Sequence, residues 1–138
     1  MVQTIYFSDI RNWSAVQQYS DFHSDEITDL SFHPFDSSIL LSSSVDGLIC
    51  FTDCSKNDTD SSLQLVVNTK FSIQNFAFSF DAHSLIVHSD DRKMAIFASN
   101  GDLISEISDL KEIDENIDFS VGFISRDSQT LSCFGNHL

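Results

Sequence analysis

Short apolar runs alternate with polar residues along this chain, and Ser, Asp and Asn gather where each run stops. Alternation with a period of two places one face of a β-strand on a core, and turn residues bound such strands. No long stretch of the chain has the 3.6-residue period of a helix. The pattern predicts an all-β protein with strands at residues 4–8, 15–19, 27–33, 38–43, 48–52, 63–68, 73–80, 84–88, 94–98, 103–107, 119–125 and 130–134.

The strand patterns return at a nearly constant spacing. Ile-x-Phe-x-Asp at 5–9 returns at 49–53, and Ile-x-x-Leu-x-Phe at 27–32 returns at 73–78 with Phe in place of Leu. The end of the second motif returns again as Val-x-Phe at 121–123. Shifts of 44, 46 and 45 residues match the ~40–45 residues of a four-stranded propeller blade.

The repeat therefore predicts a single partial β-propeller domain, with two complete four-stranded blades and a half-blade at each end. Residues 1–20 would end a first blade, 21–68 form the second, 69–108 form the third, and 109–138 begin a fourth. Because propellers close with about four to eight blades, we expect one of two arrangements. The remaining blades come either from a longer chain of which this is a part, or from further copies in an oligomer.

Residues 23–53 resemble one WD repeat position by position. The stretch opens with a histidine, continues with an apolar strand that ends before a proline, and then forms a Ser…Asp-Gly turn. Segments 32–48 and 119–137 are also similar to the WD repeat-containing protein 89 family. The positions that match the general repeat are His23, Ile27, Leu30, Phe32, Pro34, Ser42, Asp46, Gly47, Thr52 and Asp53.

The resemblance implies a structural network within the second blade, formed by His23, Ser42, Asp46 and Thr52. Imidazole can bond to a hydroxyl through one ring nitrogen and to a carboxylate through the other, so such a network can be satisfied while buried. Thr52 stands where the family has Trp, and it lacks an indole N–H. We therefore expect a weakened network of this kind.

The third blade matches the repeat less well. Thr69 takes the place of the histidine, and Ala98-Ser99 takes the place of the Trp-Asp pair. Either Asp91 or Arg92 falls at the turn position, depending on a one-residue gap.

The charge balance limits the partners. The chain has 21 acidic and 7 basic residues, a formal net charge of −14. Nucleic acids and anionic membranes need Lys and Arg, which this chain does not supply as a face. We therefore expect a protein or peptide partner, and a basic one would be attracted to the surface formed by Asp25, Glu26, Glu106, Asp109, Glu112, Asp114 and Glu115.

No residue pattern indicates catalysis, a cofactor or a metal. Ser42 is predicted to lie within a buried strand, so a nucleophilic role beside His23 is rejected. Cys50 and Cys54 are not followed by a second pair at zinc-ligand spacing, and with Cys133 they make an odd count. Free thiols and the absence of a signal-peptide pattern predict an intracellular protein, in the cytoplasm or nucleus.

These observations favour a non-catalytic protein–protein interaction scaffold of WD-repeat type. The alternative is a propeller enzyme with a carboxylate or metal site in the central channel of the complete ring. The residues predicted near that channel are Asp25, Glu26 and Asp118. A strongly shifted carboxyl pKa in an open central pocket would favour the enzyme.

Overall fold

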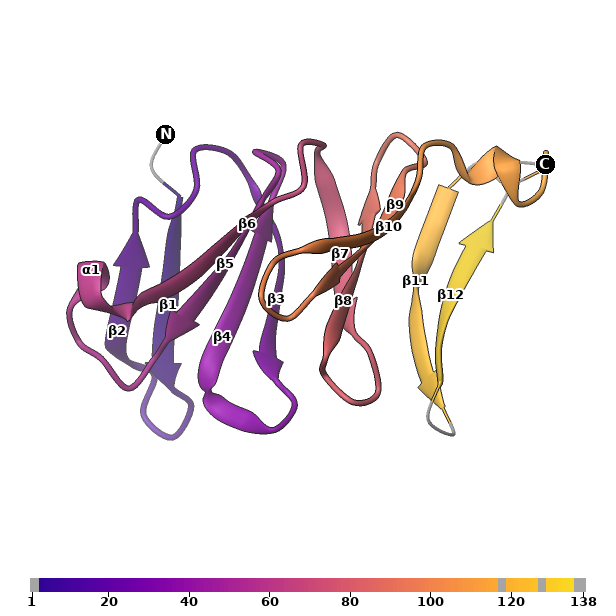
Figure 1. Ribbon diagram of the computed structural model, residues 1–138. Coiled ribbons are helices and arrows are strands. Elements are labelled where there is room, and N and C mark those ends of the chain that lie inside the picture. Colours follow the sequence, from indigo (N-terminus) through magenta and orange to yellow (C-terminus); the bar gives the residue numbers. More distant parts are fainter. Residues whose placement is uncertain (1–2, 117–118, 127–128, 136–138) are drawn as a thin grey trace.

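Twelve strands form four antiparallel sheets that stand side by side (Figure 1). The computed structural model describes residues 3–116, 119–126 and 129–135. Two four-stranded sheets lie between two-stranded sheets at either end. The fold class is confirmed: the chain is an all-β partial propeller with two complete blades and a half-blade at each end. The predicted parts 1–20 and 109–138 include residues 1–2, 117–118, 127–128 and 136–138, which lie outside the described residues.

Each sheet is a meander in which consecutive strands pair. The first sheet contains β1 (Thr4–Asp9) and β2 (Ser14–Ser20). The second contains β3 (Ile27–His33), β4 (Asp36–Ser44), β5 (Leu48–Asp53) and β6 (Leu63–Asn68). The third contains β7 (Ile73–Phe78), β8 (Ser84–Ser89), β9 (Met94–Ala98) and β10 (Leu103–Ile107). The last contains β11 (Phe119–Arg126) and β12 (Gln129–Gly135).

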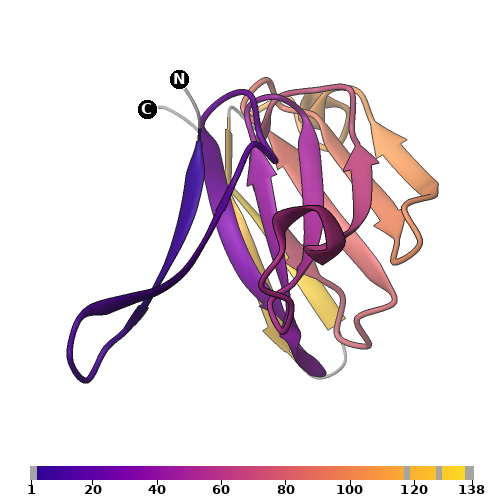
Figure 2. The same cartoon turned by 90° about the vertical axis from the view of Figure 1, so that its left-hand side faces the viewer.

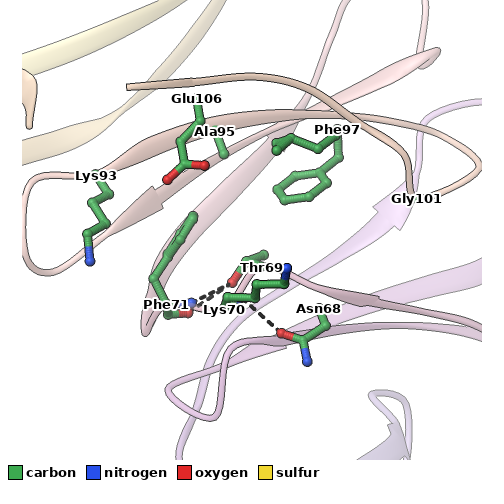
Figure 3. A pocket seen from close by; sticks show the side chains of 10 residues that line it. Asn68, Thr69, Lys70, Phe71, Lys93, Ala95, Phe97, Gly101 and Glu106 are labelled. Atoms are coloured by element: carbon green, nitrogen blue, oxygen red, sulfur yellow. Dashed lines mark hydrogen bonds between the residues drawn. The ribbon is translucent and has the colours of Figure 1, made fainter. Parts of the chain in front are cut away.

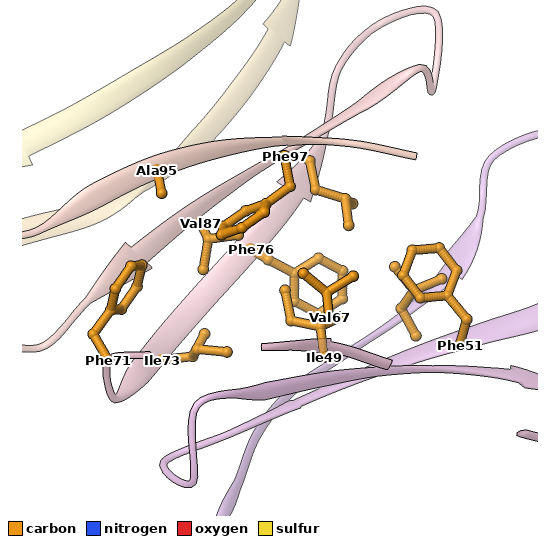
Figure 4. Close-up of a cluster of buried hydrophobic side chains, with 11 residues drawn as sticks. Ile49, Phe51, Val67, Phe71, Ile73, Phe76, Val87, Ala95 and Phe97 are labelled. Atoms are coloured by element: carbon orange, nitrogen blue, oxygen red, sulfur yellow. The ribbon is translucent and has the colours of Figure 1, made fainter. Parts of the chain in front are cut away.

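The main hydrophobic core lies between the two four-stranded sheets (Figure 4). Each sheet has one apolar face that is buried only against its neighbour, as expected of stacked repeats. A smaller cluster of Ile5, Tyr19 and Leu40 joins the first sheet to the second. The main core consists of Leu41, Ile49, Phe51, Val67, Phe71, Ile73, Phe76, Leu85, Val87, Ala95 and Phe97.

The β1–β2 hairpin reaches away from the other sheets at its turn (Figure 2). Asp9 accepts hydrogen bonds from the Arg11 backbone and guanidinium across this turn. Trp13 has φ 58° and an 80% exposed side chain there. The hairpin turn is therefore built from local contacts rather than from contacts with the body.

The strand connections alternate between two edges of the molecule. The β2–β3, β4–β5, β6–β7, β8–β9 and β10–β11 connections lie along one edge, which is uppermost in Figure 1. We call this the loop edge. The β1–β2, β3–β4, β5–β6, β7–β8 and β9–β10 connections lie on the opposite side of the meanders.

Two connections contain helical turns. The β5–β6 connection ends in α1 (Thr59–Ser62), whose first turn is capped by Asp58 accepting from the Ser61 N–H. The acidic segment 109–116 contains a 3₁₀ turn, η1 (Leu110–Glu112), capped by Asp109. Leu110 is fully buried, so this segment is anchored to the body rather than wholly solvated.

The strand predicted at 73–80 ends earlier, at Phe78, because a turn begins there. The Ser79 hydroxyl donates to Asp81, and the Ser79 N–H donates to the Ser84 carbonyl. Phe80 is left exposed in this turn. Within the described residues, no helix is long and apolar enough to cross a membrane.

Candidate functional site

The second sheet brings His23, Ser42 and Asp46 together. His23 precedes β3 and is buried, with Nε2 2.8 Å from Ser42 Oγ on β4. Its Nδ1 lies 3.4 Å from Asp46 Oδ1 and 3.3 Å from Asp46 Oδ2 in the β4–β5 turn. Asp46 also accepts hydrogen bonds from the Ser24 and Leu48 N–H groups. These contacts tie the entry into the sheet to its β4–β5 turn.

Burial and hydrogen bonding set the charge states in this network. Burial lowers the pKa of His23, although the nearby Asp46 carboxylate and Ser42 act in the opposite direction. Burial on its own would raise the pKa of Asp46, but the Leu48 and Ser24 N–H groups and His23 outweigh it and lower that pKa. A neutral imidazole beside an ionised carboxylate follows from these directions. The neutral tautomer with hydrogen on Nδ1 fits both contacts of the ring.

Six of the seven acidic residues named from the sequence lie at two ends of the loop edge, and the seventh, Glu106, lies on β10. Asp25 and Glu26 are in the β2–β3 connection, toward one end, whereas residues 109–115 follow β10 toward the other (Figure 1). Asp109 is engaged with Arg92, at 3.1 Å, and this contact lowers the Asp109 pKa. The Asn116 N–H lowers the pKa of Asp114. Asp25, Glu26, Glu106, Glu112, Asp114 and Glu115 are exposed.

A cavity of about 270 Å³ lies at the β6–β7 connection, between that connection and the outer strands of the third sheet (Figure 3). We call it the junction cavity. Its floor is apolar, and its mouth carries two lysines and one glutamate. The lining residues are Asn68, Thr69, Lys70, Phe71, Lys93, Ala95, Phe97, Gly101, Leu103 and Glu106.

Hydrogen bonds fix the shape of the β6–β7 connection. Asn68 Oδ1 accepts from the Lys70 N–H at 2.9 Å, and Lys70 has a left-handed backbone with φ 65°. Thr69 is buried, and its Oγ1 lies 2.9 Å from the Phe71 carbonyl oxygen and 3.0 Å from that of Gly47. Lys93 Nζ lies 2.7 Å from Asp91 Oδ2, a contact that raises the Lys93 pKa. Hydrogen bonds therefore fix the conformation of the loop that forms this wall of the cavity.

Comparisons with known proteins show similarity to WD repeat-containing proteins. No protein-family model matches the chain. It is 35% identical over 71 residues, 51% of this chain, to a WD repeat-containing protein 89 homolog of Dictyostelium discoideum. An uncharacterized WD repeat-containing protein of Saccharomyces cerevisiae is 37% identical over 65 residues, which is 46% of this chain. An uncharacterized WD repeat-containing protein of Schizosaccharomyces pombe is 46% identical over 43 residues, which is 31% of this chain. These matched regions are similar to WD repeat-containing proteins. The matched regions span 20%, 17% and 13% of these three relatives.

The WD-repeat positions can now be compared between the two complete blades through their sheet registers. Ser43 pairs with Ile49 in the second sheet, and His88 pairs with Met94 in the third, so the blades superpose with a shift of 45 residues. Gly47, with φ 83°, then corresponds to Arg92, with φ 67°. Asp91 accordingly takes the place of Asp46, and no gap is needed.

The same register corrects the position assigned to the Trp-Asp pair in the third blade. Thr52 pairs with Leu40, and Phe97 pairs with Leu85, so Phe97-Ala98 rather than Ala98-Ser99 takes that place. A local motif shift of 46 had displaced the alignment by one residue. By the same shift, Val87 takes the place of Ser42, so the third blade has apolar side chains where the second has polar ones.

Thr52 makes no hydrogen bond to the other three residues of the predicted WD-repeat network. Its side chain is fully buried, and Oγ1 has no hydrogen-bond partner among the described residues. The physical reason is reach, because the threonine hydroxyl is bonded to Cβ, close to the backbone, whereas an indole N–H lies on the far side of a large ring. The contacts seen in this blade therefore join three residues, His23, Ser42 and Asp46.

The described residues also show whether the other side chains considered for catalysis or metal binding are accessible and suitably grouped. Ser42 is fully buried, which leaves its hydroxyl beside His23 without access to a substrate. Burial raises the pKa of the Cys50 thiol to about 12, and Cys50 and Cys54 are both free. No group of three or more His, Cys, Asp or Glu in the described residues could hold a metal ion. Asp118 lies outside the described residues.

The junction cavity was not predicted from the sequence. Its residues come from two blades, and their sequence spacing has no motif of its own. One local signal was present: Asn68 lies two residues before Lys70 in a short polar connection, a composition typical of tight turns that admit a left-handed residue. That signal predicts the turn but not the cavity beside it.

Proposed function

We propose that this WD-repeat chain is a non-catalytic protein-interaction scaffold whose loop edge binds a Lys/Arg-rich segment of a partner protein. One observation carries the proposal: the stacked sheets align the connections of successive blades along one edge, where acidic side chains outnumber basic ones (Figure 1). An extended basic segment could contact several of these connections in turn.

The ion pairs on this edge engage two of its basic groups. Arg92 contacts Asp109, and Lys93 contacts Asp91, so two of the edge's basic groups already have acidic neighbours. Glu112 and Glu115 are exposed beyond these pairs. A mobile basic segment would meet mainly carboxylates that no lysine or arginine of this edge covers.

Kinship supports the general class of function. The three relatives are WD repeat-containing proteins, and repeat proteins of stacked sheets use their extended surfaces for binding. The names of these relatives identify no partner. The basic character of the partner rests on charge sign and on the position of the acidic residues.

The test is binding of a fluorescent Lys/Arg-rich peptide to the chain over a salt titration. We expect Kd to rise steeply between about 50 and 500 mM salt, because the Debye length falls from roughly 14 Å to roughly 4 Å and exposed charges are screened more strongly. The double variant Glu112→Gln/Glu115→Gln should weaken binding at low salt by about three- to tenfold, as each exposed pair contributes about 0.2–1 kcal/mol.

The matched control is Asp81→Asn/Asp102→Asn, which removes the same charge from the β7–β8 and β9–β10 connections on the opposite edge. Both of these residues are exposed. Equal weakening by the two double variants would show that net charge, and not the loop edge, attracts the peptide. Binding that ignores salt would refute the electrostatic basis of the proposal.

A further inference from the structure

We infer that the junction cavity binds an apolar side chain of a partner peptide that has an acidic residue next to it. The inference goes beyond the proposed function, because this ligand has the opposite charge and enters a different site. It shares with that function only the assumption that the chain binds peptides. The apolar floor, the charge at the mouth and a comparison with the preceding blade junction carry it.

The floor of the junction cavity is suited to an apolar anchor. Phe71 and Phe97 are 8% and 4% exposed, and each presents part of its ring to the cavity (Figure 3). Ala95 between them is short, and Leu103 on β10 forms a 53% exposed rim. A volume of about 270 Å³ accommodates one large side chain. Pockets that combine an apolar anchor site with polar groups are where binding energy concentrates in protein interfaces.

The mouth of the cavity provides an available cation. Lys70 is exposed and forms no ion pair among the described residues. Its backbone is held in the left-handed conformation by Asn68, which costs free energy for a residue with a side chain. Lys93 on the other side is already paired with Asp91 and lies near Glu106. Lys70 is therefore the group that would meet a ligand carboxylate.

The preceding blade junction shows that a lysine is not required by the blade geometry. A cavity of about 330 Å³ lies at the β2–β3 connection, where Asp21, with φ 68°, precedes Phe22 just as the left-handed Lys70 precedes Phe71. Leu63, the first residue of β6, stands in the place of Leu103, the first residue of β10. The lining residues of this second cavity are Ser20, Asp21, Phe22, Thr59, Asp60 and Leu63.

Both junctions thus have a left-handed residue followed by a phenylalanine, but that residue is acidic in one and basic in the other. Aspartate adopts the left-handed conformation more readily than lysine, so the backbone alone does not favour a lysine at this position. The charge difference between Asp21 and Lys70 would instead change the affinity of each cavity for a charged ligand. It predicts that the junction cavity at β6–β7 favours an anionic neighbour of the anchor, whereas the β2–β3 cavity does not.

The experiment uses three fluorescein-labelled peptides: Gly-Glu-Phe-Glu-Gly, Gly-Lys-Phe-Lys-Gly and Gly-Glu-Ala-Glu-Gly. We expect the first to shift the backbone amide resonances of Phe71, Ala95 and Gly101 of the whole chain, and the alanine peptide to leave them in place. Lys70→Glu should weaken binding of the first peptide by about three- to tenfold, because an exposed attraction becomes a repulsion. Lys70→Gly also removes the ammonium but relieves the left-handed strain, so it should weaken binding without loss of fold.

The matched control is Lys111→Glu, an identical charge reversal on the loop edge at a residue that does not line the cavity. Its Kd for the first peptide should change less than about twofold. Equal effects of the two reversals, equal binding of the Glu and Lys peptides at this cavity, or resonance shifts elsewhere would overturn the inference. These outcomes are independent of whether Glu112→Gln/Glu115→Gln alters binding of a basic peptide, so the two proposals can fail separately.

Discussion

Acid should destabilise the third blade through His88. This residue lies on β8, is fully buried, and pairs in register with Asn75 on one side and Met94 on the other. Burial lowers its pKa to about 4. The ordinary pKa of histidine in an unfolded chain is about 6.5. The unfolded chain therefore binds more protons than the folded chain between these two values.

The sign and the size of the effect follow from this difference. A group whose folded pKa is depressed below the unfolded value makes stability rise with pH, so the free energy of unfolding falls as pH decreases below about 6.5. The slope approaches about 1.4 kcal/mol per pH unit well below pH 6.5, and His88 contributes about 2 kcal/mol between pH 7.5 and pH 5. The pKa of His23 is also lowered by burial, so it contributes with the same sign.

The choice of pH range isolates the histidines. The folded pKa values of Asp46 and Asp91 are lowered from 3.8, so their stabilising contributions are lost mainly below about pH 4. Urea unfolding followed by far-UV circular dichroism should be compared at about pH 7.5 and pH 5. We expect the fall in unfolding free energy to be smaller by about 2 kcal/mol in His88→Gln than in the unaltered chain.

His83→Gln is the matched control, because His83 is exposed in the β7–β8 turn. Its pH dependence should equal that of the unaltered chain. Any loss of packing in His88→Gln lowers stability at both pH values and cancels in the comparison. The reasoning is refuted if His88→Gln retains the full pH dependence, or if an NMR titration of the His88 ring gives a pKa near 6.5.

Three further substitutions test the second blade. Thr52→Val should raise the urea unfolding free energy by about 1 kcal/mol, because it removes a buried hydroxyl without a partner; a loss of stability would contradict this. Gly47→Ala should lower that free energy by about 2 kcal/mol, since φ is 83° and the added Cβ would lie 2.9 Å from the Phe71 carbonyl oxygen; an unchanged thermal midpoint would disprove it. Ser42→Ala should cost about 1–2 kcal/mol in urea unfolding, because it deprives the buried His23 ring of its 2.8 Å contact; a neutral result would show that the ring finds another partner.

Local pattern was sufficient to predict the strands. All twelve predicted segments are strands, and the segments at 27–33, 63–68, 94–98 and 103–107 have the predicted bounds. Alternation of apolar and polar residues, bounded by turn residues, acts within each segment and does not require knowledge of its neighbours. The repeat near 45 residues then indicated stacked blades, because one blade cannot bury its apolar face alone.

Pairing between strands could not be obtained in the same way. Motif matching allowed shifts of 44 to 46 residues, whereas the hydrogen-bonded register of β4–β5 and β8–β9 gives 45. This difference of one residue changes which side chain corresponds to the family tryptophan, from Ala98 to Phe97. It also explains why the sequence alone could not decide between Asp91 and Arg92 at the turn. A shift of one residue changes the face on which a side chain lies, so only the register decides which groups meet.

The sequence by itself determined the all-β class, the repeat and the three residues that meet in the second blade, since each depends on local alternation or on a motif within one blade. The tertiary structure alone decided that Leu110 is buried, that the acidic residues divide between two ends of the loop edge, and that Lys70 stands beside an apolar cavity. The physical reason is that these features arise where one sheet packs on the next. Contacts between blades depend on the stacking of whole sheets, which the periodicity of a single strand does not specify.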